Sequence, residues 1–216
     1  MSKLEELRGK IDAREARIGV IGLGYVGLPL AVELGNAGFS VIGFDVDVTK
    51  VRTISEGRSY IGDVESCKVA KLLEQGRLEA TGDFDKLATV DVINICVPTP
   101  LRKTRDPDVS FIASAMKEIR KHLHEGQLII LGSTTYPGTT HEFVIPLLAG
   151  AGLEIGKDYA LAFAPERIDQ RGDVVDDVGV GTEKRILVDS VPVQRFRLDV
   201  ADAGEIAANL GPGVAV

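Results

Sequence analysis

A glycine-rich stretch near the N-terminus constrains the fold of this chain more than any other feature. The sequence RIGVIGLGYVGLPLA opens on an apolar run, Ile18 to Ile21, which ends in a series of glycines. Apolar residues after Gly27 recur at helical spacing, and Pro29 suits the first turn of a helix, where the N–H that proline lacks has no helical partner. The pattern predicts a strand, a tight turn and the start of a helix.

The glycines of this turn each meet a separate physical requirement. Gly22 lets the backbone leave the strand at dihedral angles that a Cβ would resist. Gly24 leaves room for a pyrophosphate, and Gly27 allows close packing of helix on strand. Free N–H groups and the positive end of the helix dipole then face the phosphates. We expect the whole turn to bind a dinucleotide through Gly22, Leu23, Gly24, Tyr25, Val26 and Gly27.

An acidic residue follows the next apolar run, Phe39 to Phe44. Asp45 stands eighteen positions after Gly27, close to the spacing of about 20 at which an acid binds the adenosine ribose. A carboxylate there accepts a hydrogen bond from the 2′-OH and repels a 2′-phosphate, which predicts NAD rather than NADP. A glycine turn without ligand, a flavin site and an S-adenosylmethionine site remain as alternatives at this point.

The composition excludes several classes of protein. The hydrophobic fraction is 44%, and the net charge of −7 argues against nucleic-acid or acidic-membrane binding, since no basic stripe is available. Cys67 and Cys96 are too few for a disulfide framework or a zinc site, so we predict no metal and a reducing, cytoplasmic location. The long uncharged run at residues 18–32 is shorter than the roughly 20 residues of a membrane span, and no membrane segment is predicted.

Strand-like and helix-like segments alternate along the chain, which predicts an α/β fold with a doubly wound parallel sheet covered by helices on both faces. We expect six strands within residues 16–165, preceded by a short N-terminal helix in residues 1–15. The assigned strands are residues 18–21, 39–44, 90–97, 128–131 and 159–164, the last being counted as the sixth. The expected helices are residues 48–56, 64–73 and 109–123, and one that ends near residue 149 and is kinked or shortened by Pro146.

Polar residues gather where the later strands end. Pro98 and Thr99 follow one strand, and the charged loop 102–108 after them is either a solvated surface or a lid that meets phosphate oxygens. Ser133 and Thr134 follow the next strand, where hydroxyls can donate to a cofactor or cap a helix. Cys67 is expected to be buried on a helix face, and Cys96 to be buried inside a strand, without a catalytic role.

Five motifs in this order identify a family. They are GLGYVGLPLA at 22–31, ICVPTPL at 95–101, DPDVS at 106–110, STTYPGTT at 133–140 and APERID at 164–169. Together they resemble the UDP-glucose/GDP-mannose dehydrogenases, and most closely the UDP-N-acetylhexosamine 6-dehydrogenase branch, which tends to read PER where UDP-glucose enzymes read PEF. The resemblance covers residues 16–170 and implies a Rossmann-type NAD-binding domain.

The resemblance also implies an activity and residue roles. The family oxidises the C6 alcohol of a nucleotide sugar to a carboxylate with NAD, through a thioester on a cysteine, in polysaccharide biosynthesis, and is usually homo-oligomeric. The substrate expected here is a UDP-sugar. Glu166 matches the glutamate that handles a proton or positions water, the alternative being a salt bridge to an arginine. The other residues implied at the cofactor and the reacting centre are Asp45, Lys50, Pro98, Thr99, Ser133 and Thr134.

The chain also departs from the family pattern. Gly132 stands where the family usually has Glu, and Ala164 where it has Ser. The family continues through a central helix and a second domain with the nucleophilic cysteine, for which residues 171–216 offer no counterpart. We expect these residues to form an irregular, degraded or truncated tail. The chain is then the NAD-binding half of a dehydrogenase, with a non-catalytic NAD-binding module or an inert fragment as the alternative.

The first prediction concerns the choice of cofactor. Because of the glycine turn and Asp45, the chain should bind NAD with clear preference over NADP, which calorimetric titration with both dinucleotides measures directly. Equal affinities, or a preference for NADP that survives Asp45→Ala, would contradict the assignment.

Overall fold

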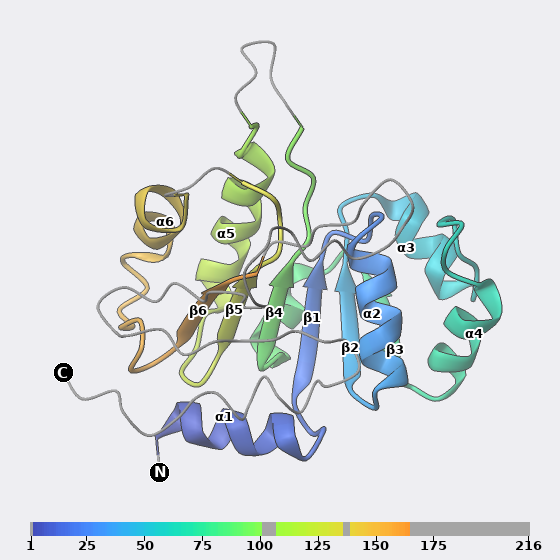
Figure 1. Ribbon diagram of the computed structural model, residues 1–216, viewed down its shortest axis with the longest axis horizontal. Coiled ribbons are helices and arrows are strands. Elements are labelled where there is room, and N and C mark those ends of the chain that lie inside the picture. The colour runs from blue at the N-terminus through green and yellow to red at the C-terminus, as the bar shows by residue number, and fades with distance from the viewer. Residues whose placement is uncertain (1, 101–106, 136–138, 165–216) are drawn as a thin grey trace, which may run out of the picture.

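A six-stranded parallel sheet organises the computed structural model, which describes residues 2–100, 107–135 and 139–164. The strand order is β3-β2-β1-β4-β5-β6, and every neighbouring pair runs parallel (Figure 1). The strands are β1 (Arg17–Ile21), β2 (Ser40–Phe44), β3 (Leu78–Thr81), β4 (Val92–Ile95), β5 (Leu128–Leu131) and β6 (Ala160–Phe163). The order reverses direction between β1 and β4, which confirms the predicted doubly wound fold.

Helices cover both faces of this sheet. They are α1 (Lys3–Asp12), α2 (Gly27–Asn36), α3 (Val48–Ser55), α4 (Ser66–Glu74), α5 (Ser110–His122) and α6 (Ile145–Leu148), with a 3₁₀ turn η1 (Phe84–Thr89) and a π-helical turn η2 (Thr140–Val144). One buried core lies between the sheet and α1, α2 and α4, and a second lies between the sheet and η1, α5 and α6. Burial on both faces explains why most strands read as unbroken apolar runs. None of the helices in the described ranges is long and apolar enough to cross a membrane.

The strand at one edge of the sheet, β3, is the one that the sequence does not reveal. It has a single neighbour, β2, and only Leu78 among its four residues is fully buried. Such a short edge strand carries neither a continuous apolar run nor a clear alternation, so hydrophobic pattern gives no signal for it. The expected strand at 90–97 is also shorter in the structure, where β4 ends at Ile95.

The two cysteines differ from their predicted positions. Cys67 was predicted to be buried on α4, and this prediction is wrong, because Cys67 is exposed and its Sγ lies 3.4 Å from the Glu65 carboxylate. The buried side of α4 is set by Val69, and a residue two positions away lies about 200° around a helix from it. Cys96 is buried as expected, but it follows β4 rather than lying within it.

Pro146 interrupts its helix as predicted. The segment begins as the π-helical turn η2 and continues as the single α-turn α6, in whose first positions Pro146 stands. Proline has no N–H to donate to the carbonyl four residues earlier, so the preceding turn is free to widen. Glu166, the charged loop residues 102–106 and the expected tail 171–216 lie outside the described residues.

The helix α1 lies across the end of the sheet at which the strands begin (Figure 1). Its Leu7 and Ile11 are buried in the first core. Asp91, just before β4, accepts hydrogen bonds from Lys10 Nζ at 2.6 Å and from the Arg17 backbone N–H at 2.8 Å. One carboxylate therefore joins α1, β1 and the start of β4.

The second prediction tests a buried polar contact at this same end of the sheet. Gln127 is fully buried, and its side-chain amide donates to the carbonyls of Leu87 at 3.2 Å and Val90 at 2.9 Å. Gln127→Leu removes these donors at nearly constant volume and should lower the free energy of unfolding in urea by about 1–3 kcal/mol. The control Gln75→Leu changes an exposed glutamine and should alter it by less than about 0.5 kcal/mol. Equal effects of the two substitutions would contradict this account.

Candidate functional site

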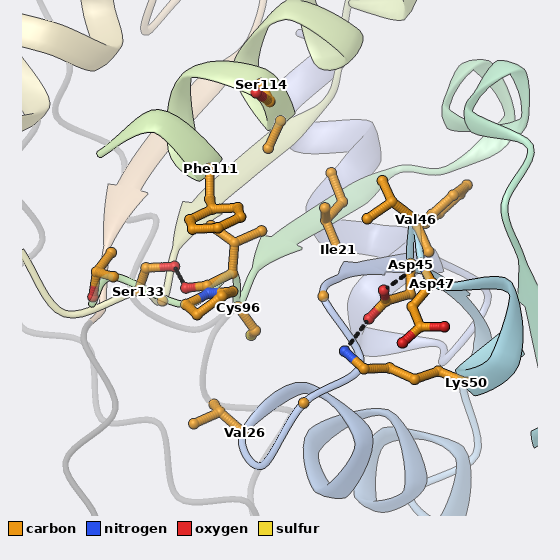
Figure 2. A pocket seen from close by; sticks show the side chains of 18 of the residues that line it. Ile21, Val26, Asp45, Val46, Asp47, Lys50, Cys96, Phe111, Ser114 and Ser133 are labelled. Atoms are coloured by element: carbon orange, nitrogen blue, oxygen red, sulfur yellow. Dashed lines mark hydrogen bonds and ion pairs between the residues drawn. The ribbon is translucent and has the colours of Figure 1, made fainter. Parts of the chain in front are cut away.

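A cleft opens at the carboxyl ends of the strands, above β1, β2 and β4. It has a volume of about 730 Å³. This is the point at which the strand order reverses, where parallel α/β sheets bind their ligands. Its walls are the glycine turn after β1, the segment after β2, the loops after β4 and β5, and one face of α5 (Figure 2). Segments from distant parts of the sequence thus meet around one cavity.

The glycine turn fits the requirements that the sequence indicates. Gly22 has a φ of +92°, and a Cβ there would lie 2.7 Å from the Cys96 carbonyl oxygen. A Cβ on Gly27 would lie 1.8 Å from the Gly22 carbonyl oxygen, so both glycines are demanded by the fold itself. A Cβ on Gly24, by contrast, would meet nothing within 4 Å. Gly24 borders open cleft space, as expected of a glycine reserved for a ligand.

Asp45 is a buried residue at the end of β2, and its carboxylate accepts hydrogen bonds from neighbouring segments. Its Oδ2 accepts hydrogen bonds from the Leu23 N–H at 2.9 Å and from Lys50 Nζ at 3.0 Å, and its Oδ1 accepts one from the Asp47 N–H at 2.9 Å. Figure 2 shows Lys50 directed at the Asp45 carboxylate. A carboxylate offers about four acceptor positions, of which three are used. One remains for a hydroxyl in the cleft, so Asp45 fits the predicted ribose contact while also supporting the turn.

Tyr60 approaches the same turn from the segment between α3 and α4. Its hydroxyl donates to the carbonyl oxygen of Leu23. Burial raises the pKa of Tyr60 far above its ordinary value, and the nearby charges of Asp45 and Asp47 raise it further. The hydroxyl therefore stays protonated and remains a donor.

The hydroxyls at the ends of β4 and β5 join two loops. Ser133 Oγ donates to the Val97 carbonyl at 2.7 Å and lies 3.2 Å from the Ile95 carbonyl oxygen, and Thr99 Oγ1 donates to the Thr134 carbonyl at 2.7 Å. Helix capping was the other use expected of this region, but Thr139 at the N-cap of η2 makes no side-chain capping bond. These bonds do not involve the Thr134 side chain, which is exposed and lines the cleft. It can therefore contact a ligand.

One face of α5 forms a cleft wall that sequence reasoning missed. The apolar stripe of α5, which includes Ile112, Met116 and Ile119, is buried in the core. A neighbouring stripe at helical spacing lines the cleft through Phe111, Ser114, Ala115 and Glu118. The spacing of three and four residues was the available signal, because it marks a second face of the same helix.

The cleft carries apolar side chains after β2, on η1 and on α5. Val46 and Phe111 line it and are 84% and 45% exposed, so both can contact a ligand. Phe84 also lines the cleft, with its ring centroid 5.6 Å from that of Phe44. A flat apolar group such as adenine suits these walls, and the open space at Gly24 suits a pyrophosphate. The residues present therefore fit a dinucleotide.

The structure brings together most of the predicted site residues. Ten of them line the cleft: Gly22, Gly24, Tyr25, Val26, Asp45, Lys50, Pro98, Thr99, Ser133 and Thr134. Leu23 and Gly27 do not, because the Leu23 side chain is buried beneath the turn and Gly27 packs against Gly22. Glu166 lies outside the described residues. In the part of the chain that the structure covers, no group of three or more His, Cys, Asp or Glu side chains could hold a metal ion.

Known proteins resemble this chain in both sequence and structure. Residues 16–191 match the sequence model of the NAD-binding domain of the UDP-glucose/GDP-mannose dehydrogenase family. UDP-N-acetyl-D-glucosamine 6-dehydrogenase of Pseudomonas aeruginosa is 35% identical over 157 residues, which are 72% of this chain and 36% of that protein. The match confirms NAD as the cofactor predicted from the glycine turn.

Two solved structures are similar over the same region. GDP-mannose dehydrogenase from Pseudomonas aeruginosa, in a ternary complex, has a TM-score of 0.68 at 36% identity, over 71% of this chain and 36% of that one. UDP-D-ManNAc dehydrogenase from Pyrococcus horikoshii has a TM-score of 0.67 at 35% identity, over 71% of this chain and 37% of that one. The chain thus spans little more than a third of the length of these relatives.

The third prediction separates the two uses of glycine in the turn. Gly24→Ala should change the free energy of unfolding by less than about 0.5 kcal/mol, because its Cβ meets no protein atom. It should nevertheless weaken NAD binding about tenfold or more in a calorimetric titration, since the methyl group enters the space of the pyrophosphate. Gly22→Ala should instead destabilise the fold by about 1–3 kcal/mol, because its φ is positive and its Cβ meets backbone.

Gly62→Ala is the matched control for this experiment. A Cβ at Gly62 also meets nothing within 4 Å, and Gly62 does not line the cleft. Neither stability nor NAD affinity should change. Unaltered NAD binding by Gly24→Ala would show that the pyrophosphate does not lie against this turn.

Proposed function

The chain belongs to the UDP-glucose/GDP-mannose dehydrogenase family, and from this premise we propose that it is the cofactor-binding part of an enzyme that oxidises the C6 alcohol of a UDP-N-acetylhexosamine to a carboxylate. The observation that carries the proposal is the cleft in which the glycine turn, Asp45 and the loops after β4 and β5 meet. Bound NAD supplies the hydride acceptor that alcohol oxidation requires.

The glycine turn and the end of β2 are assigned to the adenosine diphosphate half of the cofactor. The amides that begin at Gly24 donate to the pyrophosphate, because the first helical hydrogen bond of α2 is the one from the Leu28 N–H to the Gly24 carbonyl. Asp45 accepts from a ribose hydroxyl. Lys50 lies beside it as a cation, 35% exposed, and can turn toward the ribose or a phosphate oxygen.

The loops after β4 and β5 are assigned to the reacting end of the site. Pro98 fixes an extended exit from β4, and the bonds of Thr99 and Ser133 hold the two loops against each other. This rigid wall presents the Thr134 hydroxyl to the cleft, where it can donate to the cofactor or the substrate. Glu166 follows β6 in sequence, and we assign it the proton transfer that oxidation of an alcohol requires.

The substrate class is proposed from the family branch. The PER sequence at 165–167 resembles the form that members of the UDP-N-acetylhexosamine branch tend to carry. The relatives named above act on UDP-N-acetyl-D-glucosamine, UDP-D-ManNAc and GDP-mannose, so an acetamido sugar on UDP accounts for two of the three. The thiols of Cys67 and Cys96, which form no disulfide, fit a cytoplasmic enzyme, since reducing conditions preserve thiols.

We further propose that these 216 residues do not complete the oxidation by themselves. The second oxidation needs an exposed, activated thiol to trap the aldehyde. Cys96 is buried between Gly27 and Gly132, next to the turn assigned to the pyrophosphate. Cys67 lies on α4, which packs against α2 and β3 at the edge of the sheet away from Thr134. Neither thiol is placed for the reaction.

The fourth prediction follows from these positions. The pure chain, incubated with NAD and UDP-N-acetylglucosamine, should bind NAD but give no sustained NADH and no uronate product. Without an exposed, activated thiol to trap the aldehyde, the second oxidation has no route to the carboxylate. Sustained turnover that Cys67→Ser or Cys96→Ser abolishes would overturn the proposal. UDP-N-acetylmannosamine and UDP-glucose should be assayed in parallel. A lack of turnover with all three sugars could then not be attributed to the choice of UDP-N-acetylglucosamine as substrate.

A further inference from the structure

Tyr60 contacts the glycine turn although it lies 37 residues away from it in sequence. It stands in the segment between α3 and α4, the residue is 37% exposed, and its hydroxyl donates to the Leu23 carbonyl. Tyr60 is not among the residues that line the cleft. Its hydrogen bond is to the backbone of the turn.

This contact fixes the direction of a peptide group. In a planar trans peptide the carbonyl of one residue and the N–H of the next point in opposite directions. A donor on the Leu23 carbonyl therefore sets the direction of the Gly24 N–H. The preceding peptide is held in the same way, because the Leu23 N–H donates to Asp45 at 2.9 Å. Two consecutive peptide planes at the entrance of the turn are thus restrained by side chains.

The second of these planes needs such a restraint. Gly24 has no Cβ and borders open space, so packing does not oppose rotation of the 23–24 peptide. Leu23, by contrast, is fixed by its side chain, which lies so close under Gly43 that a Cβ there would be 2.6 Å from Leu23 Cδ2. The conformational freedom of the turn therefore lies mainly at Gly24, next to the Leu23 carbonyl that accepts the hydrogen bond from Tyr60.

We propose that Tyr60 is a positioning residue for cofactor binding, which keeps the Gly24 amide directed at the pyrophosphate by holding the Leu23 carbonyl. The proposal rests on the cofactor role assigned to the turn. It predicts that loss of the hydroxyl weakens ligands that contain a pyrophosphate and spares ligands that contain only the adenosine half. A residue that merely stabilises the fold would affect both ligands alike.

The experiment uses the full chain, with Tyr60→Phe as the test and Ser59→Ala as the matched control. Ser59 lies in the same segment, but its hydroxyl donates to the Ile61 carbonyl at 3.1 Å within that segment. Calorimetry with ADP-ribose and with adenosine measures the ratio of the two affinities. Tyr60→Phe should weaken ADP-ribose about fivefold, the equivalent of one neutral hydrogen bond, and adenosine by less than about twofold. Ser59→Ala should leave the ratio unchanged.

Hydrogen exchange provides a second measurement that does not depend on a ligand. Amides of residues 23–26 should exchange faster in Tyr60→Phe than in the wild type, while those in the middle of α2 should not. An unchanged affinity ratio, or equal acceleration across α2, would overturn the role of Tyr60. Failure of the wild-type chain to bind ADP-ribose would instead overturn the cofactor site itself, and the positioning role with it.

Discussion

The arrangement of the site depends on one buried carboxylate, that of Asp45. It receives hydrogen bonds from the turn after β1, from the segment that follows β2 and from the first turn of α3. A buried carboxylate is tolerated only when donors replace the water that it loses, so these segments cannot separate without a large cost. The same group that we propose as the ribose contact therefore also fixes the distance between the glycine turn and the end of β2.

Close backbone approach is the second constraint on the cleft. Gly22, Gly27 and Gly132 bring the turn, the start of α2 and the end of β5 against the end of β4, with Cys96 between them. Side chains at these positions would force the strand ends apart and widen the cleft floor. The floor is accordingly made of backbone and small groups, whereas its walls carry the aromatic and charged side chains of η1, α3 and α5.

Sequence pattern predicted those parts of the structure that local burial determines. The strands β1, β2 and β5 are buried on both faces and read as apolar runs, and the glycines and Asp45 stand at motif spacing. Edge strand β3, the exposed side of α4 that carries Cys67 and the cleft-lining face of α5 were missed or misplaced. Each of these depends on which neighbour packs against an element, which periodicity alone does not specify. The bond from Tyr60 to Leu23 is likewise invisible in sequence, because neither partner belongs to a recognisable pair.

The position of α1 has a practical consequence for work on this protein. The helix lies at the end of the sheet where the strands begin (Figure 1). It is held there by Leu7, Ile11 and the Lys10–Asp91 ion pair. The cleft opens at the opposite end of the strands. An affinity tag, fluorophore or surface linker attached ahead of residue 2 thus emerges on the side of the sheet remote from the nucleotide. Immobilised in this way, the protein presents its cleft to solution.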